Sequence, residues 1–353
     1  MDQVEFQLKI LIRELSFQNS EPVLINFEKE NVHVIIKKNE NNKHSDLIIE
    51  KIEELANEDF IRILLALRNN KLPKNIREEN INRYIENGMI EKKGNEDYEI
   101  TAYPINELLS DEFNQYISSE YRSLSNLGTD IINILFWKNG IKGLTNPKAM
   151  GEFSFKINKE TDFKELHLPI FVSIDIGQGI YFNRKVIESL KASMQLEDSF
   201  PTVGHELWRE AWHNRNNNPR SACVLAIASI ESTLVEYISR KVPVAEWIIT
   251  NLPKPNLLKI LNEYVRKVIE NDQEIYYFPL NDELNKRLRM VINYRDNIMH
   301  TGKSILANDD LESILIICRD ILYMLDYQFG NQWAEQYISK STKELYNNEV
   351  SGI

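Results

Sequence analysis

The run YRDNIMH, residues 294–300, places a cation, a carboxylate and an imidazole close together in the chain. On the 3.6-residue period of an α-helix, Arg295 interrupts an apolar face whose other members are Leu284, Leu288, Val291 and Ile298. An unpaired guanidinium on such a face would be costly to desolvate. We therefore expect Arg295 to point to a seam of a helix bundle, to a partner chain or to an anionic ligand.

A second face of the same predicted helix is polar and is formed by Arg289, Asn293, Asp296 and His300. Asp296 lies four residues before His300, within reach to orient the imidazole ring. Further cations make the neighbourhood basic, namely Lys286, Arg287, Arg289 and Lys303. Because the whole chain has a formal net charge of −11, any nucleic-acid site must be local, and these four cations are the candidates for binding its phosphates.

An arginine and a histidine are the groups that RNA cleavage without a metal requires. The 2′-hydroxyl attacks its own adjacent phosphate, which needs a proton acceptor or donor near neutral pH and a fixed cation for the phosphorane charge. Residues five apart on a helix are separated by about 140°, at about 100° per residue. A single chain therefore does not aim Arg295 and His300 at one phosphate, whereas a two-fold dimer supplies two of each.

Other catalytic and ligand-binding motifs are weak. A zinc metalloprotease needs two histidines four residues apart, but in HELWREAWH the pair His205 and His213 is separated by eight. The sequence has neither a nucleophile elbow nor a phosphate-binding P-loop. Cys223 and Cys318 lie in apolar helical runs and are expected to be packed free thiols. We expect no metal and no cofactor.

The composition indicates a soluble, cytoplasmic protein. The chain has 353 residues, of which 42% are hydrophobic and 27% charged, as expected for two or three globular domains. The net charge of −11 argues against a protein that coats nucleic acid indiscriminately. The sequence begins without a signal peptide, and no uninterrupted apolar run reaches the roughly 18 residues of a membrane span. Two cysteines without a disulfide pattern favour a reducing compartment.

The predicted fold is multidomain and mainly α-helical. The region 201–340 is expected to form an antiparallel helix bundle, with helices at 205–215, 219–242, 256–270, 281–300 and 308–329. The last of these has apolar residues at positions 311, 314, 315, 318, 321, 322 and 325. The residues 341–353 are expected to be a tail.

Three smaller regions are expected before the bundle. Residues 1–47 are interpreted as a small α+β segment, with a helix at 2–17 and strands at 22–27 and 31–37. Residues 48–104 resemble a winged helix, with three helices and a hairpin at 89–101. Residues 105–200 are expected to be mixed α/β, with helices at 106–122 and 184–196 and strands at 153–158 and within 165–182.

The winged-helix pattern does not favour DNA reading. Its presumptive reading helix carries Arg83 as its cation against Glu78, Glu79 and Glu86, whereas phosphate contacts need net positive charge. A structural or protein-binding role fits this charge better, although a transcription regulator with a helical dimerisation domain stays an alternative.

The stretch Arg295-Asp296-Asn297-Ile298-Met299-His300, set between PRSACVLAIASIESTLVEYI and LESILIICRDILYMLDY, resembles the HEPN domain signature Arg-polar-x(3–5)-His. The resemblance covers about residues 201–340 and includes a glutamate in the second helix, Glu231. It implies a metal-independent endoribonuclease, commonly in host defence, as a toxin or in abortive infection. Arg295, Asp296 and His300 would be catalytic, with Glu231 and Asn297 in support.

The same resemblance implies a homodimer whose two-fold axis brings both Arg-His pairs into one cleft. HEPN proteins also include inactive scaffolds and nucleic-acid-binding modules, so a non-catalytic role is the second alternative. In a structural role, a buried Arg295 would pair with Glu231, and His300 would stabilise the helix dipole as a C-terminal cation. The N-terminal 200 residues contain no catalytic constellation and are expected to sense a trigger, bind a regulatory protein or ligand, or hold the nuclease inactive.

Overall fold

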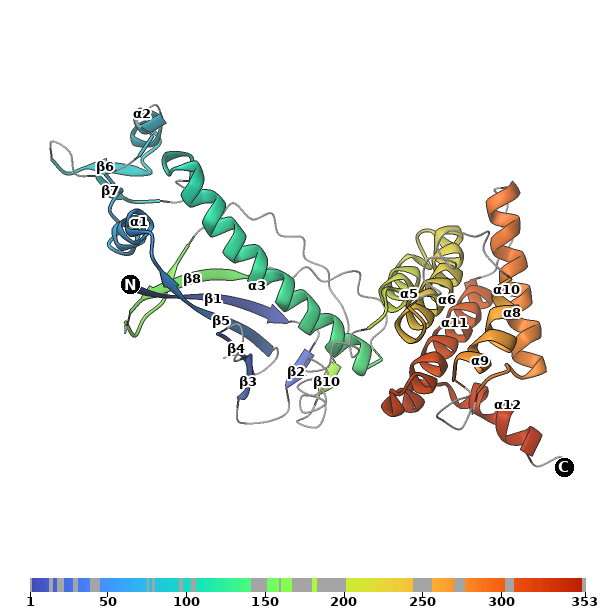
Figure 1. Cartoon of the computed structure of the whole chain (residues 1–353). Helices are drawn as coiled ribbons and strands as arrows, with labels where there is room; N and C mark the ends of the chain where they lie inside the picture. Colours follow the sequence, from blue (N-terminus) through green and yellow to red (C-terminus); the bar gives the residue numbers. More distant parts are fainter. Residues whose placement is uncertain are drawn as a thin grey trace. The chain divides into compact units, whose positions relative to one another are not determined.

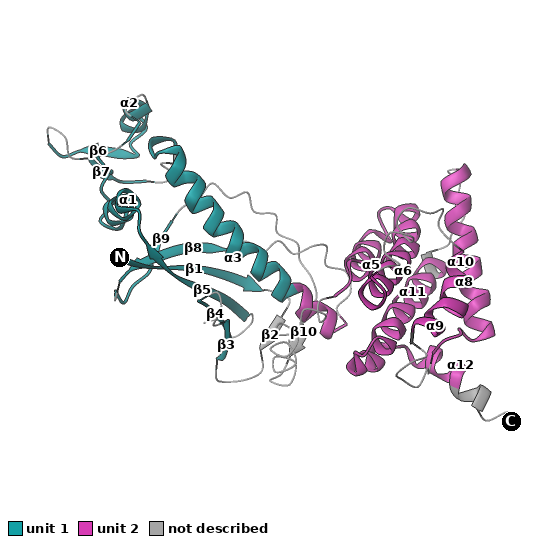
Figure 2. Cartoon of the chain, in the orientation of Figure 1, with its two compact units in different colours: residues 1–132, 148–188 teal, residues 133–147, 189–353 magenta. Residues whose placement is uncertain are grey.

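The computed structural model describes residues 2–12, 15–17, 22–27, 31–38, 45–74, 76–77, 80–94, 98–102, 106–140, 151–158, 160–166, 180–182, 201–243, 256–269, 277–301 and 308–350. These residues fall into two compact units. Unit 1 contains residues 1–132 and 148–188, and unit 2 contains residues 133–147 and 189–353 (Figure 2). The expected boundary between residues 47 and 48 lies inside a β-strand of unit 1.

Unit 1 is built on a six-stranded antiparallel sheet with the strand order β3-β4-β5-β1-β8-β9 (Figure 1). Its strands are β1 (Asp2–Ile12), β3 (Val23–Phe27), β4 (Val32–Lys38), β5 (Ser45–Leu55), β8 (Glu152–Ile157) and β9 (Lys164–Glu165). A separate parallel pair joins β2 (Leu15–Phe17) to β10 (Ile180–Phe182). The strands predicted at 22–27, 31–37 and 153–158 are thus confirmed.

Two predicted helices are wrong, because residues 2–12 and 45–55 form the paired central strands β1 and β5. In β1 every second side chain is buried, from Val4 through Phe6 and Leu8 to Ile12. This two-residue period is that of a strand with one covered face. The first of the three helices expected for a winged helix is therefore a strand.

The long helix α3 (Asp111–Lys138) covers one face of the sheet (Figure 1). Its Tyr116 ring packs edge-on against Phe6, with centroids 6.0 Å apart. Its Glu120 accepts a hydrogen bond from Lys51 of β5, with the two atoms 2.7 Å apart. The helix predicted at 106–122 and the apolar run that follows it are parts of this one helix, which a 3-10 turn (Asn106–Leu108) precedes.

Between β5 and α3 lie α1 (Glu58–Arg68), α2 (Ile81–Glu86) and the hairpin of β6 (Ile90–Lys92) and β7 (Tyr98–Ile100). The predicted hairpin and these two predicted helices are confirmed. Arg83, the cation of the presumptive reading helix, forms an ion pair with Glu107. That pairing lowers the positive charge available for a phosphate.

Unit 2 is helical. Its helices are α5 (Val203–Asn214), α6 (Pro219–Lys241), α8 (Leu257–Lys259), α9 (Val265–Ile269), α10 (Asp282–Thr301), α11 (Asn308–Gln328) and α12 (Lys340–Val350). A π-helical turn (Ile260–Tyr264) joins α8 to α9, and a 3-10 helix (Gln332–Tyr337) follows α11. The helices predicted in 201–340 are confirmed, whereas the expected tail begins as α12. The helix expected at 184–196 lies outside the described residues.

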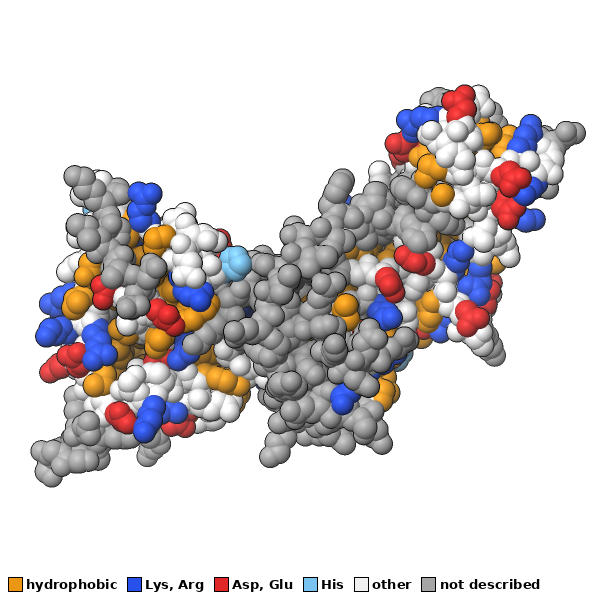
Figure 3. Space-filling model, turned by 180° about the vertical axis from the view of Figure 1, so that it is seen from behind, with side chains coloured by type: hydrophobic (Ala, Val, Ile, Leu, Met, Phe, Trp, Pro, Cys, Tyr) orange, Lys and Arg blue, Asp and Glu red, His pale blue; other side chains and the backbone are white. Residues whose placement is uncertain are grey.

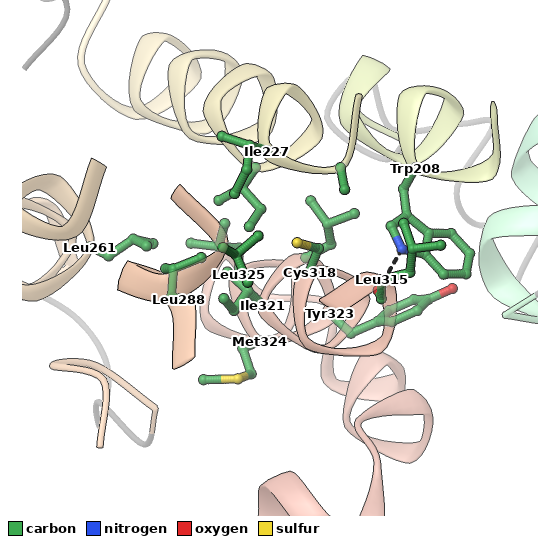
Figure 4. Packing of buried hydrophobic residues seen from close by; sticks show 14 of the residues in the cluster. Trp208, Ile227, Leu261, Leu288, Leu315, Cys318, Ile321, Tyr323, Met324 and Leu325 are labelled. Atoms are coloured by element: carbon green, nitrogen blue, oxygen red, sulfur yellow. Dashed lines mark hydrogen bonds between the residues drawn. The ribbon is translucent and has the colours of Figure 1, made fainter. Parts of the chain in front are cut away.

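The core of unit 2 surrounds α11 (Figure 4). All seven apolar positions predicted on α11 are buried. The neighbouring α5 contributes Trp208, whose Nε1 donates a hydrogen bond to the Leu315 carbonyl over 2.8 Å. Each fully buried leucine or isoleucine contributes about 1.5–3 kcal/mol to folding. Cys223 and Cys318 are buried free thiols, as expected, and burial raises the pKa of Cys223 to about 11 and that of Cys318 further.

Among the described residues, α6 is the one helix that is long and apolar enough to be compared with a membrane span. Its best 18-residue window has a mean hydropathy of 1.4, which is high enough for a membrane span by length and composition. However, 56% of this window is buried inside the protein, and the helix packs against α5, α10 and α11. This burial accounts for its apolar sequence as that of a core helix. Gly204 of α5 lies so close to α6 that a Cβ would overlap Thr233 and the Ser229 carbonyl.

The last turns of α3 belong to the core of unit 2. Trp137 donates its Nε1 hydrogen to Asp326 Oδ2 over 2.8 Å, and Tyr237 donates its hydroxyl to the other oxygen of that buried carboxylate. His205 Nε2 also lies 2.9 Å from Asp326 Oδ2, at an angle outside hydrogen-bonding geometry. Tyr323 donates to the Trp137 carbonyl over 3.2 Å. The bundle therefore needs residues 133–138 as well as 201–340.

Lys138, the last residue of α3, is 7% exposed, and its ammonium lies 5.5 Å from the centre of the Trp333 ring. Burial lowers the pKa of Lys138 from 10.5 to about 8. Between about pH 8 and 10.5 the unfolded chain therefore binds more protons at this residue than the folded chain does. From Lys138 alone, stability rises with pH across that window, so the charged form is destabilising at neutral pH.

Candidate functional site

Helix α10 presents the candidate site. Asn281 caps its start, because the side-chain oxygen accepts a hydrogen bond from Glu283 N over 2.8 Å. Asp282 and Glu283 lie in its first turn, where acidic residues favour helix formation. The predicted apolar face is buried, as its four members show, namely Leu284, Leu288, Val291 and Ile298. The helix contacts α6, α8, α11 and α12.

Arg295 lies on this buried face, in the seam between α10 and α6. Its Nη2 lies 2.6 Å from Glu231 Oε1, and its Nη1 lies 3.0 Å from Asp296 Oδ1. The side chains of Arg295 and Glu231 are 27% and 23% exposed, respectively. The expectation that Arg295 points to a bundle seam is therefore confirmed, and Glu231 is the residue that pairs with it there.

The guanidinium of Arg295 is already paired with carboxylates in this seam. Its Nη2 faces the carboxylate of Glu231 and its Nη1 faces that of Asp296, one formal positive charge against two formal negative charges. A phosphate would have to displace at least one carboxylate to bind Arg295 with good geometry. Asp296 is the easier one to displace, because its side chain is 47% exposed.

His300 lies in the last turn of α10 with an exposed ring. Within the described ranges it makes no hydrogen bond or ion pair, and the expected contact with Asp296 is absent because that carboxylate faces Arg295. Asn297 is exposed, and its carbonyl accepts a hydrogen bond from the Thr301 hydroxyl over 2.6 Å. One chain thus has Arg295 in the seam and His300 in solvent, as the separation of about 140° implies.

The other candidate cations do not form one patch. Lys286, Arg287 and Arg289 are all exposed, but at about 100° per residue they point to different sides of α10. Arg287 Nε lies 2.8 Å from Glu283 and is paired with it. Arg289 shares the exposed stripe of His300, while Lys303 lies outside the described residues. Acidic and basic side chains are interspersed on the helical unit in Figure 3.

An open groove lies along the same seam. Its volume is about 700 Å³ and its lining comes from α5, α6 and α10. The lining residues are Glu210, Asn214, Asn218, Arg220, Ser221, Val224, Leu225, Ile298 and Met299. Sequence reasoning missed this groove, although two signals point to it: the asparagine-rich loop between α5 and α6, and a methionine directly before His300.

The described residues offer no alternative metal centre, since no three His, Cys, Asp or Glu side chains among them are placed to share an ion. The arrangement that they do offer is a seam arginine, a solvent-facing imidazole and an adjacent groove. These groups can bind an anion and exchange a proton with a bound molecule. In comparisons with known proteins, no family model, curated protein or solved structure matches the chain.

Proposed function

We propose that unit 2 is a metal-independent endoribonuclease of HEPN type. The observation that carries this proposal is the position of Arg295, a cation embedded in the α6–α10 seam by Glu231 yet still 27% exposed. A guanidinium held in this way is fixed in place and can meet a phosphate at the surface. The exposed His300 lies further along the same helix and can exchange protons with a substrate.

In the proposed reaction, the 2′-hydroxyl of one nucleotide attacks the adjacent phosphorus. A histidine accepts the hydroxyl proton while a new bond forms from the 2′-oxygen to phosphorus. The bond to the 5′-oxygen of the next nucleotide breaks, and that oxygen leaves with a proton supplied by a second histidine or by water. The products end in a 2′,3′-cyclic phosphate and a 5′-hydroxyl, and the guanidinium stabilises the charge of the phosphorane.

A homodimer is part of the proposal, because one chain holds Arg295 and His300 on different sides of α10. A two-fold axis near this helix would place the arginine of one protomer close to the histidine of its partner. Single-stranded RNA is the preferred substrate class, since an unpaired backbone can reorganise in a narrow cleft. Asn297, which is exposed three residues before His300, and Arg289, which is exposed on the same stripe about three turns earlier, would contact the same RNA.

The biological setting that we propose is defence, as a toxin or an abortive-infection nuclease, in the cytoplasm. Unit 1 would regulate the activity by binding a protein or ligand trigger. The sheet of unit 1 has a hollow of about 500 Å³ at the ends of β1 and β5, lined by residues that include His33, Lys51 and Glu53. Such a polar hollow is a reasonable place for a small trigger molecule to bind.

The second candidate function is a non-catalytic scaffold of the same fold. The observation that favours it is the pairing of Arg295 with both Glu231 and Asp296, which satisfies the guanidinium without any substrate. A winged-helix regulator is less well supported, because Arg83 is paired with Glu107. The two HEPN candidates differ in what His300→Ala does, since a scaffold would keep its function after that change.

The proposal is tested by incubating end-labelled total RNA with the full chain in EDTA. Wild type, Arg295→Ala and His300→Ala are compared after circular dichroism has shown that all three are folded. Cleavage by wild type alone, with products ending in cyclic phosphate, is the expected result. Cleavage that persists in His300→Ala would show that the site is wrongly assigned.

A further inference from the structure

The groove of unit 2 continues the seam that holds Arg295. On α10, Ile298 and Met299 lie one turn beyond Arg295 on the same side, about 5.4 Å along the helix. On α6, Val224 and Leu225 lie about two turns before Glu231. The two helices are therefore antiparallel here, and the groove lies one to two helical turns from the paired guanidinium along the seam.

The groove has an apolar floor and a rim that forms hydrogen bonds. The floor is formed by Val224, Leu225, Ile298 and Met299, and residue Met299 is 64% exposed. Asn214, Asn218 and Ser221 supply neutral polar groups, while Arg220 is an exposed cation at the start of α6. Glu210 is the acid of the lining.

The two rim amides have complementary groups to offer. The side-chain amino group of Asn214 donates a hydrogen bond to the backbone carbonyl of Glu210 over 3.0 Å, so the side-chain oxygen of Asn214 can still accept one. Asn218 uses its side-chain oxygen to cap α6 by accepting from Ser221 N at 3.2 Å, so its amino group can still donate. The rim thus presents one hydrogen-bond acceptor, on Asn214, and one donor, on Asn218. These two residues lie at the two ends of the short loop between α5 and α6.

We propose that this groove binds an unpaired base of RNA next to the phosphate that is cleaved, an inference that rests on the proposed nuclease function. A base has an apolar face that can lie on Met299 and the aliphatic floor, and an edge that carries both donors and acceptors. Its flanking phosphates can meet Arg220 on one side and Arg295 on the other. In a duplex, the faces of a base are stacked on its neighbours and its Watson–Crick edge is paired with the other strand. The groove should therefore select single-stranded RNA.

A second copy of the chain is the competing occupant. Its helix would need an apolar stripe to cover the floor, and the open oxygen of Asn214 and the open amino group of Asn218 would then lose water without a matching partner. The charged and amide-bearing rim fits a nucleotide better than an apolar helix. This difference in chemistry is why we assign the groove to RNA.

The test measures binding of a short fluorescein-labelled oligouridylate to the full chain in EDTA, by fluorescence anisotropy. All variants carry His300→Ala so that the RNA stays intact. Met299→Ala should weaken binding about fivefold, as expected when one base loses a contact worth about 1 kcal/mol. Met299→Phe should restore binding, because an aromatic ring is a better platform for a base.

Met290→Ala is the matched control, since Met290 is a 50% exposed methionine of the same helix that does not line the groove. Its affinity should stay within about twofold of the parent. Equal affinities for the Met299→Ala and Met290→Ala proteins would overturn the inference, as would a parent protein that does not bind single-stranded RNA. The inference would also be overturned if light scattering showed that Met299→Ala turns a dimer into monomers while RNA binding stays normal, because the groove would then hold a second copy of the chain.

Failure of the nuclease proposal gives a different result. In that case RNA would bind, with loss of affinity in Met299→Ala, but the protein with an intact His300 would not cleave it in EDTA. The groove would then be a binding site for RNA in a non-catalytic protein.

Discussion

The pair formed by Arg295 and Glu231 allows the strongest test of the site. Glu231→Gln keeps the shape of the side chain and removes the charge that lies 2.6 Å from the guanidinium. At an effective dielectric constant of about 20, the Coulomb attraction at that distance is about 6 kcal/mol. Desolvation and water competition offset most of it, because both side chains are about a quarter exposed. We expect a net coupling of about 1–2 kcal/mol.

The assay is a double-mutant cycle of unfolding in urea with Arg295→Gln, Glu231→Gln and the double variant. All five tryptophans lie within the sequence of unit 2, so their fluorescence follows that unit alone. The control cycle uses Glu283 and Arg287 of α10, which are 2.8 Å apart but 44% and 45% exposed. That exposed pair should couple by at most about 0.5 kcal/mol.

The same variants separate a functional arginine from a structural one. If Arg295 binds phosphate, Glu231→Gln releases the guanidinium and should tighten RNA binding although the protein becomes less stable. A coupling at the level of the control pair would refute the reasoning about the seam. A large coupling combined with unchanged RNA binding and cleavage in every variant would show that Arg295 is a structural residue only.

Four further outcomes are expected. In anisotropy titrations, Asp296→Asn should tighten RNA binding about threefold at low salt and less at high salt. The control Asp282→Asn, at the other end of α10, should leave RNA binding unchanged. In urea titrations, Lys138→Met should raise the free energy of unfolding at pH 7 by about 1–2 kcal/mol, and this gain should vanish near pH 10.5. The control Lys340→Met, at a side chain that is 91% exposed, should change the free energy of unfolding little. The two buried thiols should resist a thiol reagent at pH 8 until the protein unfolds, because burial raises their pKa and disfavours the reactive thiolate; rapid labelling of native protein would contradict this. A fragment that begins at residue 201 should be less stable than the full chain, as measured by tryptophan fluorescence in urea, because it lacks the bonds of Trp137.

The helical unit was largely predictable from the sequence because its pattern is local. The apolar positions of α11 recur with the helical period, and the isolated arginine of α10 stands out against four buried neighbours. The central strands were not predictable in the same way. The stretch IIEKIEEL of β5 is rich in glutamate and lysine, which favour helices, and pairing with β1 and β4 overrides that preference.

The candidate site was predictable in part. The side on which Arg295 lies follows from the helix period, and its expected pairing with Glu231 in a structural role is confirmed. Asp296 was expected to contact His300 four residues later, and it contacts the preceding residue instead. The groove arises where three helices meet, so no single segment of the sequence encodes it.

The two units are interleaved along the chain. Residues 133–147 belong with the helices, yet strands β8 and β9 of the sheet follow them in sequence. During synthesis the ribosome therefore releases Trp137 before the last strands of the sheet and long before Asp326, which receives its hydrogen bond. A gene fusion with one junction therefore cannot separate the two units intact. Any junction between residues 133 and 188 cuts through at least one of the two units. Unit 2 therefore completes its fold only when nearly the whole chain has been made, which would keep the proposed nuclease inactive until then.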